Sequence, residues 1–330
     1  MKIGIIAFTE NGNKLLKKIV SFSNEVFDCY DKKNQDLKLW ISERFEQSDA
    51  IIFIGAVGIA VRLISGLIRA KDTDPAVIVI DEFGQYVIPV LSGHIGGANV
   101  LAGQIADQLN AIPIITTATD MNNKFAADVW SGKAGCVIDD ISKIKEISSR
   151  VLKNEKVGFQ SDFEIFGKLP DELCSVGNYE AGITVSVDQH KKPFPITLNV
   201  IPKIITIGVG CKKDTAFEEM EAFILKTLEA NKISIKAVKY ISSIEIKKDE
   251  VCLRKFSEKY KIAFTTFDAL QLNAVKGVFQ GSEFVRNTTG VDNVCERSAV
   301  LQSGGKLILG KTAQNGMTIA IAASKWRCEF

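Results

Sequence analysis

Along the first 117 residues, short apolar runs alternate with stretches in which apolar side chains recur every three or four positions. The runs at 2–8 and 50–54 predict strands, and the stretches at 14–22 and 37–47 predict amphipathic helices. Residues 50–54, AIIFI, contain no polar position, which is typical of a central strand buried on both faces. This alternation predicts an α/β domain with an open parallel sheet and helices packed on it.

The segment PAVIVIDEFGQYVIPVL predicts a hairpin or tight connection, because two apolar runs flank the polar residues 81–85. SGHIGGAN follows and leads into a helix through Leu109, after which a strand at 112–115 ends in a threonine-rich segment. Ligands of open α/β sheets bind outside the carboxyl ends of the strands. We therefore expect the loop at 55–58 and the segment at 116–120 to lie at the same end of the sheet.

The pattern changes after residue 125. One amphipathic helix is predicted at 139–154, and short strands separated by Gly, Pro and Asp follow up to residue 204. A second alternating unit then begins with a strand, a glycine turn and a helix that Asp214 or Thr215 would cap. The predicted organisation is an N-terminal α/β domain, a small β-rich middle or linker domain and a C-terminal α/β domain, at residues 1–125, 126–203 and 204–330.

Composition narrows the class of protein. Hydrophobic residues make up 46% of the chain and charged residues 24%, with a net charge of +2, so no strong field attracts nucleic acid. No apolar run reaches the roughly 18 residues that span a bilayer, and MKIGIIAF lacks a cleavage site behind it. Seven widely spaced cysteines without a CxxC pair indicate reduced thiols rather than disulfides or a zinc site. We expect a cytoplasmic protein that binds neither membrane nor nucleic acid.

Only two histidines are available for acid–base chemistry. His190 lies in the charged turn DQHKKP and is predicted to be a solvated surface residue. His94 lies among glycines between an apolar strand and a helix, where a ligand could approach the backbone. The sequence leaves two interpretations open for His94, namely an acid–base group or a histidine hydrogen-bonded within its own turn.

Three glycine turns, GAVG at 55–58, GHIGGAN at 93–99 and GVGCKK at 208–213, could direct backbone N–H groups at an anion. None matches a phosphate loop or a dinucleotide fingerprint, so a carboxylate is the better ligand. Asp81, Glu82 and Asp120 follow predicted strands and are candidates for a general base or a partner of His94. The alternative for each carboxylate is a turn former or helix cap. Glu296, within VCERSAVL, is either surface-facing or directed into a cleft.

Longer segments resemble one known family. FIGAVGIAVRLI, KDTDPAVIVIDEFGQYVIPVLSGHIGGAN and PIITTATD resemble, in this order, the N-terminal part of the cobalt-precorrin-5A hydrolases of anaerobic cobalamin biosynthesis. GVGCKKDT, SSIEIKKDE, TGVDNVCERSAVL and TIAIA resemble their C-terminal domain. The chain departs at Val251-Cys252, where relatives often have Pro-Gly. The resemblance covers nearly the whole chain apart from a variable middle.

The resemblance implies hydrolysis of the ring A δ-lactone of a cobalt corrinoid, followed by a retro-aldol-like loss of acetaldehyde that gives cobalt-precorrin-5B. Such an enzyme is a hydrolase acting on a carbon–carbon bond. It would need no cofactor and no protein-bound metal, because the cobalt arrives inside the substrate. We further expect other enzymes of the pathway to hand the corrinoid over to this protein. The sequence leaves the oligomeric state open, and a homodimer is one option.

The resemblance also implies roles for individual residues. His94 is the candidate general acid/base, and Asp120 and Glu296 complete the predicted catalytic set. Backbone N–H groups of Gly96 and Gly97 could stabilise an oxyanion. The carboxylates of the corrinoid would be held across a cleft between the domains. The predicted substrate-binding residues are Gly55, Gly58, Arg62, Lys71, Glu82, Gly96, Gly97, Asn99, Thr117, Gly208, Gly210, Lys212, Lys247 and Glu250.

Two other classes of function compete with this one. A corrinoid carrier of the same pathway would bind the product tightly and release no acetaldehyde. An α/β enzyme acting on nucleotides or phosphosugars is disfavoured because the phosphate-loop motifs are missing. A thermal-shift screen with nucleotides would test the latter.

Overall fold

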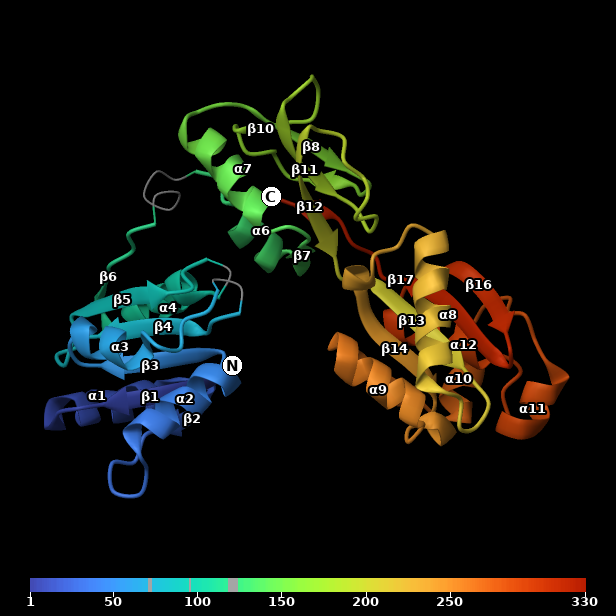
Figure 1. The fold of residues 1–330 in the computed structure, drawn as a ribbon, viewed down its shortest axis with the longest axis horizontal. Coiled ribbons are helices and arrows are strands. Elements are labelled where there is room, and N and C mark those ends of the chain that lie inside the picture. Colours follow the sequence, from blue (N-terminus) through green and yellow to red (C-terminus); the bar gives the residue numbers. More distant parts are fainter. Residues whose placement is uncertain (71–72, 95, 118–123) are drawn as a thin grey trace. The chain divides into compact units, whose positions relative to one another are not determined.

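A computed structural model describes residues 1–70, 73–94, 96–117 and 124–330 (Figure 1). The chain divides into two compact units, Met1–Trp130 and Ser131–Phe330. The division lies close to the first predicted boundary at residue 125, and a separate status for the middle segment at 126–203 stays a prediction. No helix in the described ranges combines the length and apolar character needed to cross a membrane.

The first unit contains a six-stranded sheet in the order β2-β1-β3-β4-β5-β6. Its strands are β1 (Lys2–Ala7), β2 (Val26–Cys29), β3 (Ala50–Ile54), β4 (Ala76–Ile80), β5 (Tyr86–Leu91) and β6 (Ile112–Pro113). Its helices are α1 (Glu10–Phe22), α2 (Leu37–Gln47), α3 (Val57–Ile64) and α4 (Ala98–Leu109), and α6 (Ala127–Lys133) crosses the division between the units. The predicted alternation of strands and helices is confirmed.

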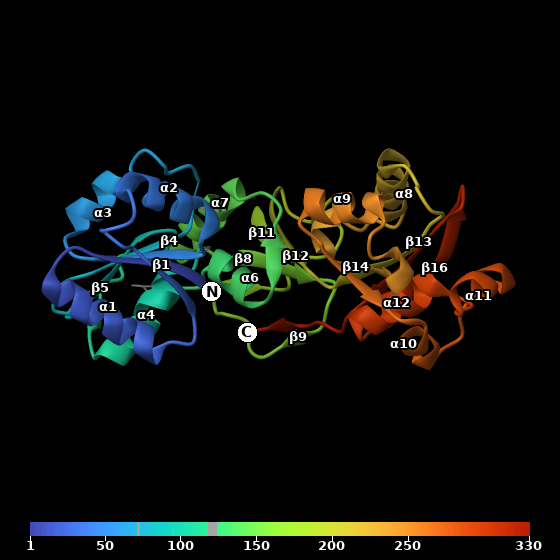
Figure 2. The ribbon, with the colours of Figure 1, turned by 90° about the horizontal axis from the view of Figure 1, so that it is seen from below.

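Helices cover both faces of this sheet, as Figure 2 shows for α2 and α3 on one side and α1 and α4 on the other. Ile52 of β3 packs in a core with side chains of α1 and α4, whereas its neighbour Phe53 packs in a second core with those of α2 and α3. Every residue of β3 and of β4 is buried. The unbroken apolar runs therefore reflect strands that contribute to a core on each face.

The sheet is mixed rather than parallel. The predicted hairpin is present, and it makes β5 antiparallel to β4, while β6 runs parallel to β5. The residues that follow β5 and β6 therefore lie at the end of the sheet where β4 begins. The expectation that residues 55–58 share one end with the segment after β6 is wrong for Thr116 and Thr117, because the hairpin reverses the chain direction between the two segments. Residues 118–120 of that segment lie outside the described residues.

The second unit begins with a five-stranded sheet in the order β10-β8-β11-β12-β7, in which only β7 pairs antiparallel. The helix α7 (Ser142–Leu152) contacts three of these strands and confirms the predicted amphipathic helix. The strands of this sheet are β7 (Cys136–Ile138), β8 (Val157–Ser161), β10 (Leu173–Cys174), β11 (Ala181–Val185) and β12 (Ile196–Pro202). The short strand β9 (Ile165–Phe166) lies outside it.

A third sheet, in the order β15-β14-β13-β17-β16, supports the C-terminal part. Its strands are β13 (Ile205–Gly210), β14 (Val238–Ile244), β15 (Ala263–Phe267), β16 (Lys306–Gln314) and β17 (Met317–Ala323). Its helices are α8 (Phe217–Ala230), α9 (Val251–Tyr260), α10 (Ala269–Ala274), α11 (Glu283–Thr289) and α12 (Val294–Ser303), with short 3₁₀ turns at Ile235–Ala237 and Glu245–Lys247. The predicted second α/β unit is confirmed.

Three local features of this unit differ from expectation. The helix α8 begins after Ala216 without a side-chain cap, so neither Asp214 nor Thr215 caps it, and the Thr215 hydroxyl instead donates to the Lys212 carbonyl at 2.9 Å. The short helices α10 and α11 were not predicted, because they span too few residues for a periodic pattern. The last strand, β18 (Cys328–Glu329), leaves the third sheet and pairs with β9.

Candidate functional site

His94 follows β5 and makes a close contact with Asp128, which lies in the first turn of α6. Nδ1 of His94 is 3.0 Å from Oδ2 of Asp128, and the two side chains are 14% and 8% exposed. A carboxylate only accepts hydrogen bonds, so Nδ1 must carry the proton in this pair. In the neutral imidazole, Nε2 is then the proton acceptor, which is the state that a general base requires.

The environment of Asp128 favours its ionised form. Burial raises the pKa of this carboxyl. The hydrogen bond and charge of His94 and the backbone N–H of Val129 lower the pKa by more than burial raises it, so it lies below its usual range. The carboxylate therefore stays charged beside the imidazole near neutral pH. This arrangement resembles the carboxylate-oriented histidines of acid–base catalysts.

The predicted partner of His94, Asp120, lies outside the described residues, as does Lys71. Asp128 was missed by sequence reasoning because it stands at the start of a short helix beyond the predicted domain boundary. The only sequence signal was a carboxylate in the otherwise apolar segment AADVW.

The glycine loop after β5 closes on itself. The N–H groups of Gly97, Ala98 and Asn99 donate to the carbonyls of His94, Ser92 and Gly93 at 2.9, 3.1 and 2.9 Å. The Gly97 amide is therefore engaged within the loop in this structure, and the oxyanion role predicted for Gly96 and Gly97 stays a prediction. A side chain at Gly96 would place its Cβ 2.3 Å from Cβ of Ser92, so this tight turn requires glycine.

Asn99 and Thr117 lie at the same end of the sheet as His94. The Asn99 side-chain amide donates to Oγ1 of Thr117 at 2.9 Å, which joins the first turn of α4 to the segment after β6. Ser92 donates to the carbonyl of Asp74, just before β4, at 3.0 Å and marks the same end. The structure thus gathers His94, Asn99, Thr117 and Asp128 where β5 and β6 end.

A second group of predicted residues lies at the opposite end of this sheet. Gly55 follows β3 and donates its N–H to Ile80 at the end of β4, and Glu82 is in the hairpin that follows. The helix α3 begins nearby without a side-chain cap, and both Gly58 and Arg62 are exposed on it. A carboxylate site at this end stays a prediction, but it is not the site of His94.

Asp81 accepts three backbone N–H groups of its own turn, which confirms the turn-former alternative for that residue.

The second unit contains a cavity of about 820 Å³. Four of the predicted residues line it, namely Gly210, Lys212, Lys247 and Glu250, and Glu250 forms an ion pair with Lys247 at 2.7 Å. Lys213 and Lys311 add positive charge to the wall, and Ile246, Val251 and Phe284 add exposed apolar surface. Such a wall suits a large ligand that has an apolar face and several carboxylates.

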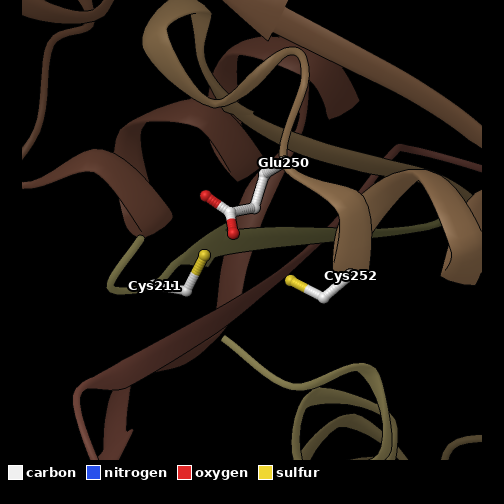
Figure 3. Close-up of side chains that lie close together, drawn as sticks. All are labelled: Cys211, Glu250 and Cys252. Carbon is white, nitrogen blue, oxygen red and sulfur yellow. The ribbon is translucent and has the colours of Figure 1, made fainter. Parts of the chain in front are cut away.

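Two cysteines meet beside this cavity. One ligand atom of each of Cys211, Glu250 and Cys252 lies within 4.8 Å of the others (Figure 3). The Cys252 thiol, together with Lys247, holds the pKa of Cys211 below its usual range despite burial, whereas the Cys211 thiol and burial raise the pKa of Cys252. The wide spacing of these cysteines in the sequence does not predict that they meet.

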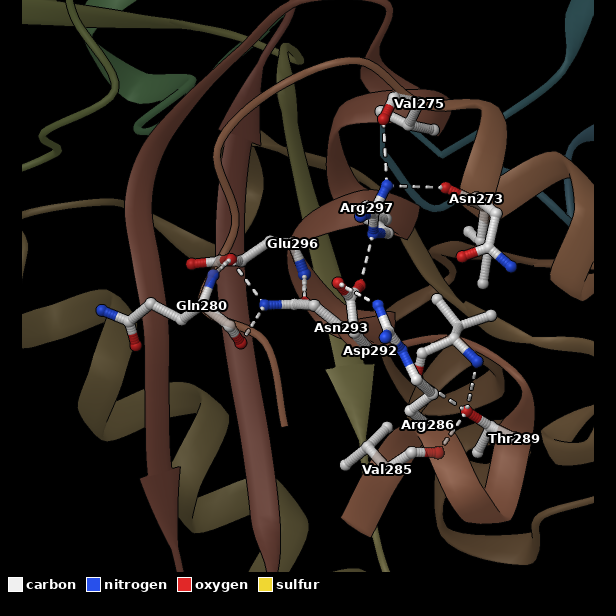
Figure 4. Close-up of polar contacts among 12 residues, drawn as sticks. Asn273, Val275, Gln280, Val285, Arg286, Thr289, Asp292, Asn293, Glu296 and Arg297 are labelled. Atoms are coloured by element: carbon white, nitrogen blue, oxygen red, sulfur yellow. Dashed lines mark hydrogen bonds and ion pairs between the residues drawn. The ribbon is translucent and has the colours of Figure 1, made fainter. Parts of the chain in front are cut away.

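Glu296 is enclosed rather than exposed to a cleft. It is 2% exposed, and its carboxylate accepts from the N–H of Gln280 at 2.8 Å and the side-chain amide of Asn293 at 2.5 Å (Figure 4). It also accepts from the N–H of Lys311 at 2.7 Å. Both interpretations drawn from the sequence, surface-facing or cleft-facing, are therefore wrong. These three donors come from two loops and a strand, so the carboxylate ties them to α12.

Gly208 also has a packing role. A Cβ on Gly208 would lie 1.8 Å from the carbonyl oxygen of Cys295, so glycine lets α12 approach β13 closely. Gly208 does not line the cavity, whereas Gly210 does. Of the two glycines of this turn, the structure brings only Gly210 to the candidate binding surface. His190 is exposed, which confirms its predicted surface position.

The fold and these sites define a two-unit α/β protein of the kind that acts on small molecules, with a carboxylate-oriented histidine in one unit and a lysine-bearing cavity in the other. Comparison with known proteins narrows this class. Family models described as "Cobalamin synthesis G N-terminal" and "Cobalamin synthesis G C-terminus" match residues 39–120 and 205–322.

Two curated relatives match most of the chain. A cobalt-precorrin-5A hydrolase from Salmonella typhimurium is 36% identical over 86% of this chain and 84% of its own length. One from Priestia megaterium is 30% identical over 96% of this chain and 94% of its own. A solved cobalamin biosynthesis protein G homolog from Sulfolobus solfataricus is 25% identical over 98% of this chain and 97% of its own, with a TM-score of 0.42. The chain belongs to the cobalt-precorrin-5A hydrolase family, as the sequence motifs predict.

Proposed function

We propose that this protein hydrolyses the ring A δ-lactone of cobalt-precorrin-5A and releases acetaldehyde, giving cobalt-precorrin-5B in anaerobic cobalamin biosynthesis. The observation that carries the proposal is the 36% identity, over 86% of the chain, to a relative named for this activity. The carboxylate-oriented His94 supports it, because the reaction needs a base to activate water and a base to remove the alcohol proton.

In this proposal Nε2 of His94 accepts the proton of the attacking water, and the Asp128 carboxylate holds Nδ1–H and stabilises the imidazolium that forms. Opening of the lactone leaves a carboxylate and an alcohol. Removal of the alcohol proton breaks the adjacent carbon–carbon bond, acetaldehyde leaves, and the electron pair spreads into the conjugated corrinoid. The cavity of the second unit would bind peripheral carboxylates of a corrinoid through its lysines.

Several expectations belong to this proposal. The reaction would use no cofactor, since cobalt is carried by the substrate. Other enzymes of the pathway would deliver and receive the corrinoid, and a homodimer is a proposed assembly. A cytoplasmic location is supported by the seven cysteines, all of which are free thiols.

The test is acetaldehyde release from enzymatically prepared cobalt-precorrin-5A by the wild type, His94→Ala and His190→Ala. His190 is the matched control because it is the other histidine and is exposed. We expect His94→Ala to lower the rate by about 10²- to 10⁴-fold, the usual contribution of a general acid or base, and His190→Ala to be unaffected. Full activity of His94→Ala would remove His94 from the mechanism. Tight corrinoid binding by the wild type without acetaldehyde would indicate a carrier.

A further inference from the structure

Cys211, Glu250 and Cys252 form a cluster of two thiols and a carboxylate that takes no part in the proposed lactone hydrolysis. Cys211 follows β13, Glu250 immediately precedes α9, and Cys252 is the second residue of α9. All three potential ligand atoms lie within 4.8 Å of one another, and Figure 3 shows both sulfurs and the carboxylate converging on one space. In a tetrahedral zinc site with Zn–S bonds of 2.3 Å, neighbouring sulfurs are about 3.8 Å apart. Shifts of about 1 Å or less would therefore bring these atoms to ligand spacing.

The carboxylate of Glu250 is already oriented toward the cysteines. It does not cap α9, although it occupies the cap position. Instead Oε1 accepts from the N–H of Asp214 at 3.0 Å, and Oε2 accepts from Nζ of Lys247 at 2.7 Å. Each carboxylate oxygen has two lone pairs, so a further bond to a cation is available after these contacts. Hydrogen bonds of this kind also orient the ligands of known metal sites.

The charge of the cluster suits a divalent ion. Two thiolates and one carboxylate carry three negative charges, and Lys247 contributes one positive charge, which leaves a charge of −2 for the ion to neutralise. Thiolate ligands select soft or borderline cations such as Zn²⁺ and Co²⁺ over Mg²⁺ and Ca²⁺. Without an ion, the Cys211 thiol and burial keep the pKa of Cys252 above its ordinary value, so binding of the cation would release the Cys252 proton.

The surroundings leave one coordination position accessible. Cys211 and Glu250 line the cavity of the second unit, whereas Cys252 is buried behind them at 1% exposure. An ion held by these three groups would therefore face the cavity with its fourth position. Three protein ligands and one open position are typical of zinc sites that bind an exogenous ligand.

We propose that Cys211, Glu250 and Cys252 form a binding site for one soft divalent cation, of the Zn²⁺ or Co²⁺ type, whose fourth position accepts water or an anionic ligand in the cavity. The proposal goes beyond the proposed function, since the proposed lactone hydrolysis requires no resident metal. It can be tested without substrate, so its failure and that of the hydrolase proposal are distinguishable.

The experiment is a titration of the full-length, fully reduced protein with Co²⁺ in oxygen-free buffer, followed by optical absorption. We expect one Co²⁺ per chain with a sulfur-to-cobalt charge-transfer band and visible bands of tetrahedral cobalt, both bleached by added Zn²⁺. Cys211→Ser should lose most of the charge-transfer absorption. Cys29→Ser is the matched control, because Cys29 is exposed and lies in the other unit.

Cys252 is buried, so both Cys252→Ser and Cys252→Ala should be compared with the wild type by circular dichroism before titration. Any variant that retains the native spectrum should show the same loss of absorption as Cys211→Ser. The proposal is overturned if the wild type shows no charge-transfer band, or if the band survives in Cys211→Ser. Mass spectrometry would detect a disulfide between the two sulfurs as a reversible loss of two hydrogens. The proposal is also overturned if this disulfide forms and the protein gives no cobalt absorption after the disulfide is reduced.

Discussion

At the scale of single residues, the contact between His94 and Asp128 links chemistry to stability. The depressed pKa of Asp128 means that its carboxylate is stabilised more in the folded than in the unfolded chain. This stabilisation is fully present above the ordinary carboxyl pKa of about 3.9 and is lost as the pH falls through the lower folded value. A carboxyl whose pKa is lower in the folded than in the unfolded chain makes the folded state less stable in acid.

The corresponding prediction concerns Asp128→Asn and Asp128→Ala. Near neutral pH both variants should unfold at lower urea concentration than the wild type, and the difference should shrink as the pH falls below about 4. A pH-independent difference would argue against an ionised Asp128. Acetaldehyde release should fall by about 10- to 100-fold in both variants, by analogy with carboxylates that orient metal-bound imidazoles.

Glu296 illustrates a buried carboxylate with a structural role. Glu296→Gln would replace one acceptor oxygen by an NH₂ group that faces a backbone or side-chain donor. We expect a loss of about 1–3 kcal/mol in unfolding free energy, the range for a buried polar group without a partner. Glu258→Gln is the control, since Glu258 is exposed on α9. Loss of acetaldehyde release at full stability would instead support the catalytic role that the sequence predicts.

At the scale of elements, the contact between β13 and α12 depends on the absence of a side chain at Gly208. Gly208→Ala would force the backbone of Cys295 away, because the new Cβ meets a carbonyl oxygen rather than a flexible side chain. We expect a loss of about 1–3 kcal/mol, the usual effect of overpacking. Gly132→Ala, in α6 with open space around it, should change the urea midpoint little. Equal effects of the two changes would contradict the close approach.

The hairpin between β4 and β5 is the element that decides where the candidate catalytic groups lie. Without it, the segments after β3 and β6 would end at the same side of a parallel sheet. With it, His94 and Thr117 lie opposite Gly55, and the polar residues of the first unit form two groups. One strand reversal therefore determines which polar residues can act together.

At the scale of the whole molecule, the C-terminal tail holds the second unit together. Nε1 of Trp326 donates to the carbonyl of Ala134 at 3.0 Å, and its ring packs edge-on against Phe163 with centroids 5.0 Å apart. Beyond it β18 pairs with β9. These contacts join the third sheet to the segment at 131–203.

Removing the Trp326 ring should therefore weaken the unit as a whole. We expect Trp326→Ala to lower the unfolding free energy by about 3–5 kcal/mol, the range for truncating a large packed aromatic side chain. Its partial burial places the effect toward the lower end. Lys325→Ala, next to it and exposed, should be neutral. Hydrogen exchange would show faster exchange in β9 of the tryptophan variant, and unchanged protection there would contradict a role for the tail.

The sequence by itself determined the order of helices and strands and the burial of β3 and β4. It also identified His94 as the histidine to examine and the family through its longer motifs. These properties depend on local periodicity and on residue type, which a single chain displays directly. The turn residues after residue 80 predict a hairpin, whereas the end of the sheet at which the following segments lie depends on how β4, β5 and β6 pair.

Only the tertiary structure decided which distant groups meet. Asp128 reaches His94, Cys211 reaches Cys252, and the Glu296 carboxylate accepts from three donors because strand pairing and helix packing bring these segments together. No periodicity encodes such contacts, since each partner obeys the pattern of its own element. The physical reason is that side-chain chemistry at a site depends on long-range packing, whereas the elements that supply the side chains depend mainly on local sequence.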